Sequence, residues 1–262
     1  MPTDARPVFI ADTCIGGLSV VKAMWGAGSA GEAVFMADYA VNPLGVKSDT
    51  VIAQVVGSWL HTAGQHSDTL VIACNTLSLR YHQLTGSIKP HSKLKNIVTM
   101  VDCIKALVEK EADRLAGRKI LIIGTEFTAS QQVYPDILSA ALPGARISTI
   151  GATQLERKIA RFQLYENDGE SMLNAALAQA LAATDVALLA CTCFPMVRMQ
   201  LEALFPGVIF LDPGAYCAGF LQQDEMTQNR MLSIKVTGNM VTKDQVTEFA
   251  KMYLGSDSIV QL

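Results

Sequence analysis

The chain has none of the features that direct a protein to a membrane, a nucleic acid or the secretory pathway. No apolar run approaches the roughly 20 residues that span a bilayer, and the start MPTDARPVFIAD lacks the apolar core of a signal peptide. Basic clusters and runs of like charge are missing, and the net charge is only −3. We therefore expect a cytoplasmic protein that binds a small molecule and has neither a nucleic-acid nor a membrane partner.

Closely spaced cysteines are missing as well. The chain of 262 residues has six cysteines, at positions 14, 74, 103, 191, 193 and 217. This scatter differs from the dense spacing of small disulfide-stabilised proteins, so we expect reduced thiols that are available for chemistry. Low-complexity linkers are also missing, and the apolar share of 50% is sufficient for a sizeable core.

What the chain does contain is a regular alternation of short apolar runs with segments of helical periodicity. The runs lie at about residues 7–11, 33–37, 69–73, 97–101, 119–123, 146–150, 186–190, 208–211 and 233–237. This alternation predicts an α/β fold with mainly parallel sheets. Similar strand-to-turn segments recur in both halves, so we expect two pseudo-symmetric three-layer α/β/α domains. The first is predicted to be discontinuous, residues 1–97 plus 209–262, and the second comprises residues 98–208.

Two cysteines end strands that have similar sequences. Cys74 lies in VIACNT at residues 71–76, and Cys191 lies in LLACTC at residues 188–193. In open α/β sheets the ligand crevice lies beyond the carboxyl ends of the strands, so both thiols are expected to face one cleft. Two such thiols suit the removal of a proton from one face of a substrate and its return to the other. The structural alternative is that each cysteine is a small buried apolar residue.

The chain resembles the aspartate/glutamate racemase family, and most closely the cofactor-independent glutamate racemases. The resemblance rests on DTCIGGLSVVKAM at 12–24, MADYAVNPLGVKS at 36–48, ACNT at 73–76, GTEFTASQQVY at 124–134, ACTCFP at 190–195 and VTGN at 236–239. It implies an active site between the two domains, a homodimer, and inversion at the α-carbon of an amino acid without pyridoxal phosphate, another cofactor or a metal. By this resemblance Cys74 and Cys191 are the acid/base thiols.

Asp12 follows the apolar run VFIA, where its carboxylate can accept a proton, orient a thiol or bind the substrate ammonium. Helix capping is the structural alternative. The resemblance makes Asp12 the third catalytic residue. It assigns substrate binding to Thr13, Cys14, Asp38, Pro43, Leu44, Gly45, Asn75, Thr76, Thr125, Thr128, Thr192 and Cys193. Turn formation and helix capping are again the alternatives for the polar members of this set.

The sequence departs from the family pattern at several of these positions. Thr13 and Cys14 replace a serine and a glycine, Leu44 replaces a tyrosine, and Cys193 replaces a histidine. A cysteine cannot supply the cation that an imidazole supplies, and leucine makes the distal pocket less polar. We therefore predict proton transfer by thiols on glutamate or a related amino acid.

Other functions are compatible with the same residues. A lyase or a cis-trans isomerase of a small dicarboxylic acid would use one cysteine as nucleophile or proton donor. A ligand-binding protein could have kept the fold while its catalytic residues changed. A metal site at Cys191 and Cys193, with Cys14 or Cys74, is not expected, because zinc usually takes CxxC-type pairs and no histidine lies near these segments in sequence.

Overall fold

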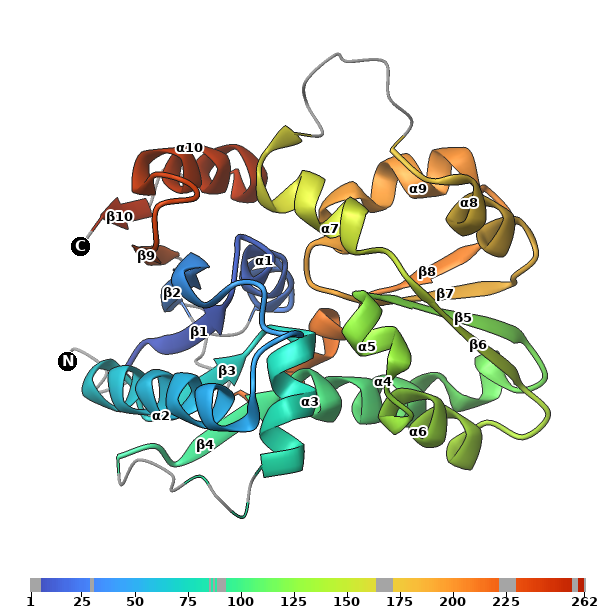
Figure 1. The fold of residues 1–262 in the computed structure, drawn as a ribbon, viewed down its shortest axis with the longest axis horizontal. Coiled ribbons are helices and arrows are strands. Elements are labelled where there is room, and N and C mark those ends of the chain that lie inside the picture. The colour runs from blue at the N-terminus through green and yellow to red at the C-terminus, as the bar shows by residue number, and fades with distance from the viewer. Residues whose placement is uncertain are drawn as a thin grey trace.

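The computed structural model of the protein describes residues 6–28, 31–84, 86, 88, 93–163, 172–221, 230–255 and 259–261. The chain forms two sheets, one in the left half and one in the right half of Figure 1, and each is flanked by helices. All strand pairs in the described residues are parallel. The predicted α/β class with mainly parallel sheets is therefore confirmed.

The first sheet contains six strands in the order β10-β9-β2-β1-β3-β4. These strands are β1 (Val8–Asp12), β2 (Glu32–Asp38), β3 (Thr69–Ile72), β4 (Asn96–Thr99), β9 (Met231–Thr237) and β10 (Ile259–Gln261). Every residue of β1 is buried, as expected for a central strand that is covered on both faces. Its sequence VFIAD is correspondingly a continuous apolar run that ends in a carboxylate.

The second sheet contains four strands in the order β6-β5-β7-β8. These strands are β5 (Lys119–Gly124), β6 (Arg146–Gly151), β7 (Val186–Ala190) and β8 (Ile209–Leu211). The order β2-β1-β3-β4 in the first sheet matches β6-β5-β7-β8 strand for strand, so the predicted pseudo-symmetry is present in the topology. Consequently β3 and β7, which precede Cys74 and Cys191, occupy equivalent places.

Helices cover both faces of the first sheet. Ile10 and Phe35 share a core with α1 (Gly17–Gly26) and α10 (Lys243–Leu254). Their sequence neighbours Phe9 and Val34 point to the opposite face and pack with α2 (Asp49–His66). This alternation is the two-residue period of a strand. The helix α3 (Asn75–Leu84) starts directly after Cys74. It packs both in the core that contains Phe9 and α2 and in a core of the second sheet.

The second sheet is covered in the same way. On one face Ile123 and Leu189 pack with α7 (Thr153–Ala160), α8 (Ala175–Ala182) and α9 (Arg198–Leu204). On the other face Ile122 and Leu188 pack with α4 (Met100–Leu115) and α6 (Val133–Ala141). The short helix α5 (Glu126–Ser130) follows β5. The part of the chain that the structure describes also contains the 3₁₀ helices η1 (Tyr39–Val41), η4 (Phe194–Val197) and η5 (Pro213–Phe220).

The strand near residue 209 does not return to the first sheet as the sequence analysis expected. Leu188 of β7 pairs with Leu211 of β8, so this strand extends the second sheet. The return to the first sheet is made by β9, which pairs with β2 over its whole length. Sequence alone shows an apolar run at 208–211 but not which edge receives it, because both sheets are parallel and both have a free edge.

Among the described residues, no helix combines the length and apolar character needed to cross a bilayer.

Candidate active site

A cavity of about 580 Å³ opens at the carboxyl ends of the central strands, between the two halves. Its wall contains thirteen of the fifteen residues predicted for the site: Asp12, Thr13, Cys14, Pro43, Leu44, Gly45, Cys74, Asn75, Thr76, Thr125, Thr128, Cys191 and Thr192. Asp12 is the last residue of β1, and the others come from segments that follow β1, β2, β3, β5 and β7. The location is the crevice that open parallel sheets offer to ligands.

Each half contributes one cysteine of the predicted pair to the cavity wall. Cys74 and Cys191 are both 8% exposed, so each sulfur is sheltered but reachable from the cavity. Cys74 lies directly before α3, and the hydroxyl of Thr13 is 3.7 Å from its Sγ. Burial and the charge of Asp12 raise the pKa of Cys74 well above its usual value, while a hydrogen bond from the Leu77 backbone opposes the shift. These surroundings therefore favour a neutral thiol at position 74.

Asp12 lies at the end of β1, between the segments that carry the two cysteines. Its Oδ1 accepts a 2.6 Å hydrogen bond from the backbone N–H of Thr13, which contacts Cys74. Its Oδ2 accepts a 2.7 Å hydrogen bond from the hydroxyl of Thr192, the neighbour of Cys191. Burial raises the pKa of Asp12 to about 6, although the bonds from Thr192 and Thr13 oppose the shift. The carboxyl group thus connects both sides of the cavity.

The halves also meet at a cluster of threonine hydroxyls. The Oγ1 of Thr76, on α3, lies 3.2 Å from that of Thr125 and 3.4 Å from that of Thr128. Thr125 caps α5 by accepting a hydrogen bond from the backbone N–H of Thr128. Beside them, the amide oxygen of Asn75 accepts a 2.9 Å hydrogen bond from the Tyr134 hydroxyl. These side chains offer neutral donors and acceptors on one wall of the cavity.

The first sheet and the turn after β7 approach each other closely at Gly16. A Cβ atom at this position would lie 2.5 Å from the Oγ1 of Thr192 and 3.0 Å from the backbone nitrogen of Cys193. Gly45 plays a similar part in the loop after β2, where a Cβ would lie 2.9 Å from that of Phe127. Both glycines therefore allow segments from opposite halves to touch around the cavity.

One face of α7 supplies cavity residues that the sequence analysis missed. Thr153, Glu156, Arg157 and Ala160 of α7, together with Arg161 directly after it, all line the cavity. Their spacing of three or four residues is that of a single helix face. Glu156 is buried, whereas both arginines are exposed at the rim. Burial and the charge of Asp12 raise the pKa of Glu156 to about 7, and a hydrogen bond from Asn42 opposes the shift.

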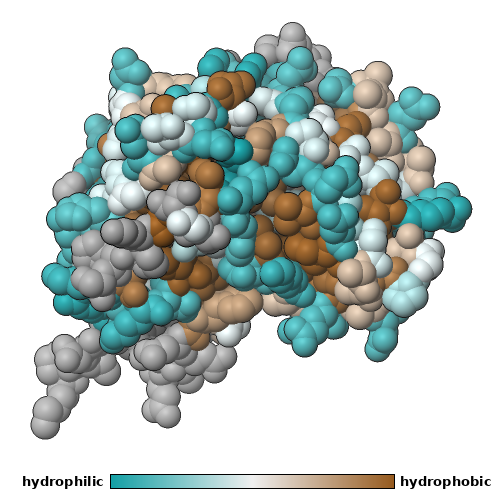
Figure 2. Space-filling view, turned by 60° about the horizontal axis from the view of Figure 1, so that its bottom comes forward, coloured by the Kyte–Doolittle hydropathy of each residue, from teal (hydrophilic) through white to brown (hydrophobic). Residues whose placement is uncertain are grey.

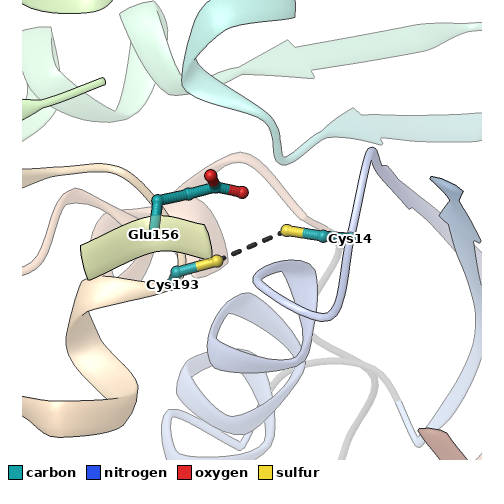
Figure 3. Close-up of side chains that lie close together, drawn as sticks. All are labelled: Cys14, Glu156 and Cys193. Atoms are coloured by element: carbon teal, nitrogen blue, oxygen red, sulfur yellow. Dashed lines mark hydrogen bonds between the residues drawn. The ribbon is translucent and has the colours of Figure 1, made fainter. Parts of the chain in front are cut away.

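Glu156 lies beside two of the cysteines that distinguish this chain (Figure 3). The Sγ atoms of Cys14 and Cys193 are 3.3 Å apart. Both sulfurs and a carboxylate oxygen of Glu156 lie within 4.8 Å of one another, and all three side chains are buried. Such a group is able to hold a metal ion, although the sequence analysis expected none.

Two predicted substrate-binding residues do not line the cavity. Cys193 is fully buried behind Cys14, at the start of η4. Asp38 ends β2, but its Oδ2 accepts a 2.7 Å hydrogen bond from the indole N–H of Trp59. Its Oδ1 accepts a hydrogen bond from the Thr237 hydroxyl on β9. The carboxylate of Asp38 is therefore occupied in joining α2 to two strands.

The fold matches that of solved racemases. Glutamate racemase from Campylobacter jejuni aligns with a TM-score of 0.74 and 22% identity over 95% of this chain and 98% of that chain. Aspartate racemase from Picrophilus torridus aligns with a TM-score of 0.53 and 16% identity over 80% and 90% of the two chains. The architecture is thus that of the racemases built from two pseudo-symmetric α/β halves.

Sequence comparison identifies the family. No family model matches the chain. The glutamate racemase from Sphingopyxis alaskensis is 32% identical over 227 residues, which cover 82% of this chain and 80% of that protein. The glutamate racemase from Latilactobacillus sakei is 24% identical over 94% of this chain and 89% of that protein. The chain belongs to the glutamate racemase family, which confirms the resemblance seen in the motifs.

Proposed function

We propose that the protein is an amino-acid racemase that needs no pyridoxal phosphate and uses Cys74 and Cys191 as its proton-transfer groups. The observation that carries this proposal is the equivalent placement of the two thiols. Each follows a corresponding strand of a pseudo-symmetric pair, and each lines the same cavity from its own half. Family membership supports the same reaction. Inversion requires one thiolate that removes the α-hydrogen and one thiol that returns a proton to the opposite face.

Asp12 is the group that serves both thiols in this proposal. It contacts the Cys74 side through Thr13 and the Cys191 side through Thr192, as described above. A carboxylate in this position attracts the substrate ammonium into the cavity and orients both threonines. The ammonium in turn favours the thiolate, since an opposite charge nearby lowers a thiol's pKa. Substrate binding therefore helps to create the base.

The substrate carboxylate has two kinds of donors available. The hydroxyls of Thr76, Thr125 and Thr128 form one wall, and the N-terminus of α3 lies directly after Cys74. The N–H groups and positive dipole end of a helix favour a carboxylate. This arrangement supports an α-amino acid as substrate without a dedicated cation for the carboxylate.

The side-chain pocket supports an acidic substrate, glutamate or a related amino acid. Leu44 makes the loop side of the cavity apolar, but Arg157 on α7 and Arg161 directly after this helix lie at the rim. Their charges attract an anionic side chain. A relative from Francisella tularensis was solved in complex with D-glutamate, and one from Escherichia coli with L-glutamate and the activator UDP-MurNAc-ala.

A chiral assay tests the proposed function. The purified protein is incubated with single enantiomers of glutamate, aspartate and neutral amino acids, and the products are separated by handedness. We expect interconversion of glutamate or a close analogue. A product other than the opposite enantiomer would assign the cavity to a lyase or cis-trans isomerase. Thermal stabilisation by an amino acid without any conversion would assign it to a ligand-binding protein.

We also propose a homodimer. The face of the molecule in Figure 2 carries hydrophobic side chains in a recess near its middle, bordered by hydrophilic ones. An apolar centre with a polar rim is the usual layout of a protein interface. Light scattering coupled to size-exclusion chromatography measures the mass, and a value twice that of the chain is expected.

We further propose that the protein is cytoplasmic. All six cysteines are free and buried, and the reaction needs thiols rather than disulfides, which supports a reducing compartment such as the cytoplasm.

The sheet pairings support a first domain that runs to β4 and resumes at β9, with the second domain from α4 to β8. Limited proteolysis that releases fragments with these ends would support the division.

A further inference from the structure

The side chains of Cys14, Cys193 and Glu156 bring two thiols and a carboxylate close together in the interior of the protein (Figure 3). Cys14 follows β1 of the first sheet, Cys193 follows β7 of the second sheet, and Glu156 lies on α7. Within the described part of the chain, no other set of three metal-ligand side chains is as closely spaced. The set therefore joins the two halves at one point beside the cavity.

We propose that these three side chains bind one zinc ion. Zinc accepts cysteine sulfur and carboxylate oxygen in a tetrahedral arrangement, with Zn–S distances of about 2.3 Å. Two sulfurs on one ion then lie about 3.8 Å apart, so the 3.3 Å separation of Cys14 and Cys193 needs to grow by only about 0.5 Å. The carboxylate of Glu156 is close enough to both sulfurs to complete a third ligand position.

The fourth coordination position faces the cavity. Cys14 and Glu156 both line the cavity wall, while Cys193 lies behind Cys14. An ion held by these three groups is therefore covered by protein on one side and open on the other. Zinc sites with three protein ligands keep a position for water or a ligand oxygen. A carboxylate oxygen of a small molecule in the cavity is of the right chemistry to occupy it.

Titration of the full-length protein with zinc tests the site. The protein is reduced with a phosphine, freed of metal by a chelator, and titrated with Zn²⁺ against a chromogenic chelator in the absence of any amino acid. We expect one equivalent to bind and the melting temperature to rise, because the ion binds only the folded chain. Co²⁺ in the same site is expected to show the visible bands of a tetrahedral ion and the near-ultraviolet charge transfer of a thiolate ligand.

Single substitutions identify the ligands. Loss of a group that merely supports a metal ligand costs about 10–100-fold in metal affinity, so Cys14→Ser, Cys193→Ser and Glu156→Gln should each weaken Zn²⁺ binding by at least about 100-fold. Cys103→Ser is the matched control. Its thiol is also buried and contacts the thiol of Cys217, but it is not part of the three-ligand group. This variant should bind Zn²⁺ as the wild type does.

Melting curves recorded in chelator show whether each variant folds, and any one folded ligand variant suffices for the comparison. Failure of the reduced wild type to bind zinc, or equal binding by Cys14→Ser, would overturn the proposal. Lack of zinc uptake together with a Cys14–Cys193 disulfide in the unreduced protein would assign the pair to thiol oxidation. Metal binding is measured without substrate, so its outcome is independent of the racemase proposal.

Discussion

At the residue scale, the position of a side chain in the sequence motif and its role in the structure can differ. Asp12 and Asp38 both end strands of the first sheet and both belong to motifs of the racemase family. Asp12 lines the cavity, whereas Asp38 bonds Trp59 and Thr237 and does not. Both carboxylates accept hydrogen bonds, but the donors to Asp12, Thr13 and Thr192, line the cavity, whereas the donors to Asp38 do not.

Replacing Asp38 by alanine is expected to reduce stability and leave catalysis unchanged. The indole N–H of Trp59, which is 1% exposed, would lose its acceptor. A buried donor left without a partner costs about 1–3 kcal/mol. Urea unfolding measures the loss, and the KM of the folded enzyme is the control. A KM that rises more than tenfold at unchanged stability would instead place Asp38 in substrate binding.

Asp212 gives a dependence of stability on pH. Burial raises its pKa from 3.8 to about 6, against the opposing effects of the Gly214 hydrogen bond and the charge of Arg198. The folded state therefore binds this proton more tightly than the unfolded state. The resulting stabilisation is complete below about pH 4 and is lost as the pH rises through about 6. Because the side chain is only half-buried, we expect the free energy of unfolding to fall by about 1–2 kcal/mol over this range.

The comparison variant for this effect is Asp212→Asn, which keeps an oxygen that can accept from the Gly214 backbone. Urea unfolding of both proteins at a series of pH values gives the difference in their free energies of unfolding. Relative to the variant, the wild type should lose stability between pH 4 and 7. A constant difference across this range would contradict the raised pKa.

At the scale of single elements, the strands were predicted well from the sequence. Of the cavity residues, those that lie at or after the ends of strands were predicted, and those on α7 were not. Apolar runs marked β1 through β9. In central strands such as β1 and β7 every residue is buried, because a strand covered on both faces needs an uninterrupted apolar sequence. The short edge strand β10 was missed, and β8 was expected in the other sheet. Cys74 and Cys191 were predictable because they follow such runs.

The contribution of α7 was not predictable in the same way. Glu156 and Arg157 lie within a helix, and helix faces point wherever packing places them. The available signal was the apolar stripe of Leu155 and Ile159, which fixes the buried face and leaves Glu156 at its border. Only the packing of this stripe against the second sheet turns Glu156 into the cavity.

The arginines of α7 are expected to act on affinity rather than on turnover. Removing both in the variant Arg157→Ala/Arg161→Ala should raise the KM for an acidic amino acid on the order of 10-fold, as each exposed charge contributes up to about 1 kcal/mol. The value of kcat should change little, and added salt should reduce the difference. Arg146→Ala is the control, because Arg146 begins β6 at the end of the sheet away from the cavity. Equal effects of both variants would contradict this role.

At the scale of the whole molecule, function depends on the contact between the two halves. Each half supplies one thiol, and the contact brings Thr192 within reach of Asp12. The two halves were predictable because similar strand-to-turn segments recur in both, in agreement with the repeated strand order of the two sheets. Their separation and orientation were not predictable, because they depend on contacts near Gly16 between residues 179 and 180 positions apart.

Gly16→Ala tests this contact. The backbone of Gly16 is helical, so alanine is compatible with it, but the new Cβ would collide with Thr192 and the backbone of Cys193. A misplacement of about 1 Å at a reacting site can cost about 100-fold in rate, and we expect a loss of that order in kcat. Gly26→Ala in the same helix meets no described atom within 4 Å and should leave kcat unchanged. Equal activity of the two variants would show that the contact is not needed.

Exchange of the α-hydrogen in deuterium oxide, followed by proton NMR, tests the central claim most directly. The wild type should replace the α-hydrogen of both enantiomers of its substrate by deuterium, with glutamate tried first. Cys74→Ser and Cys191→Ser should each slow racemisation by at least about 10²-fold, because each removes one of the two proton-transfer groups. A folded wild type that exchanges no amino acid's α-hydrogen, or cysteine variants that racemise at the wild-type rate, would contradict the account.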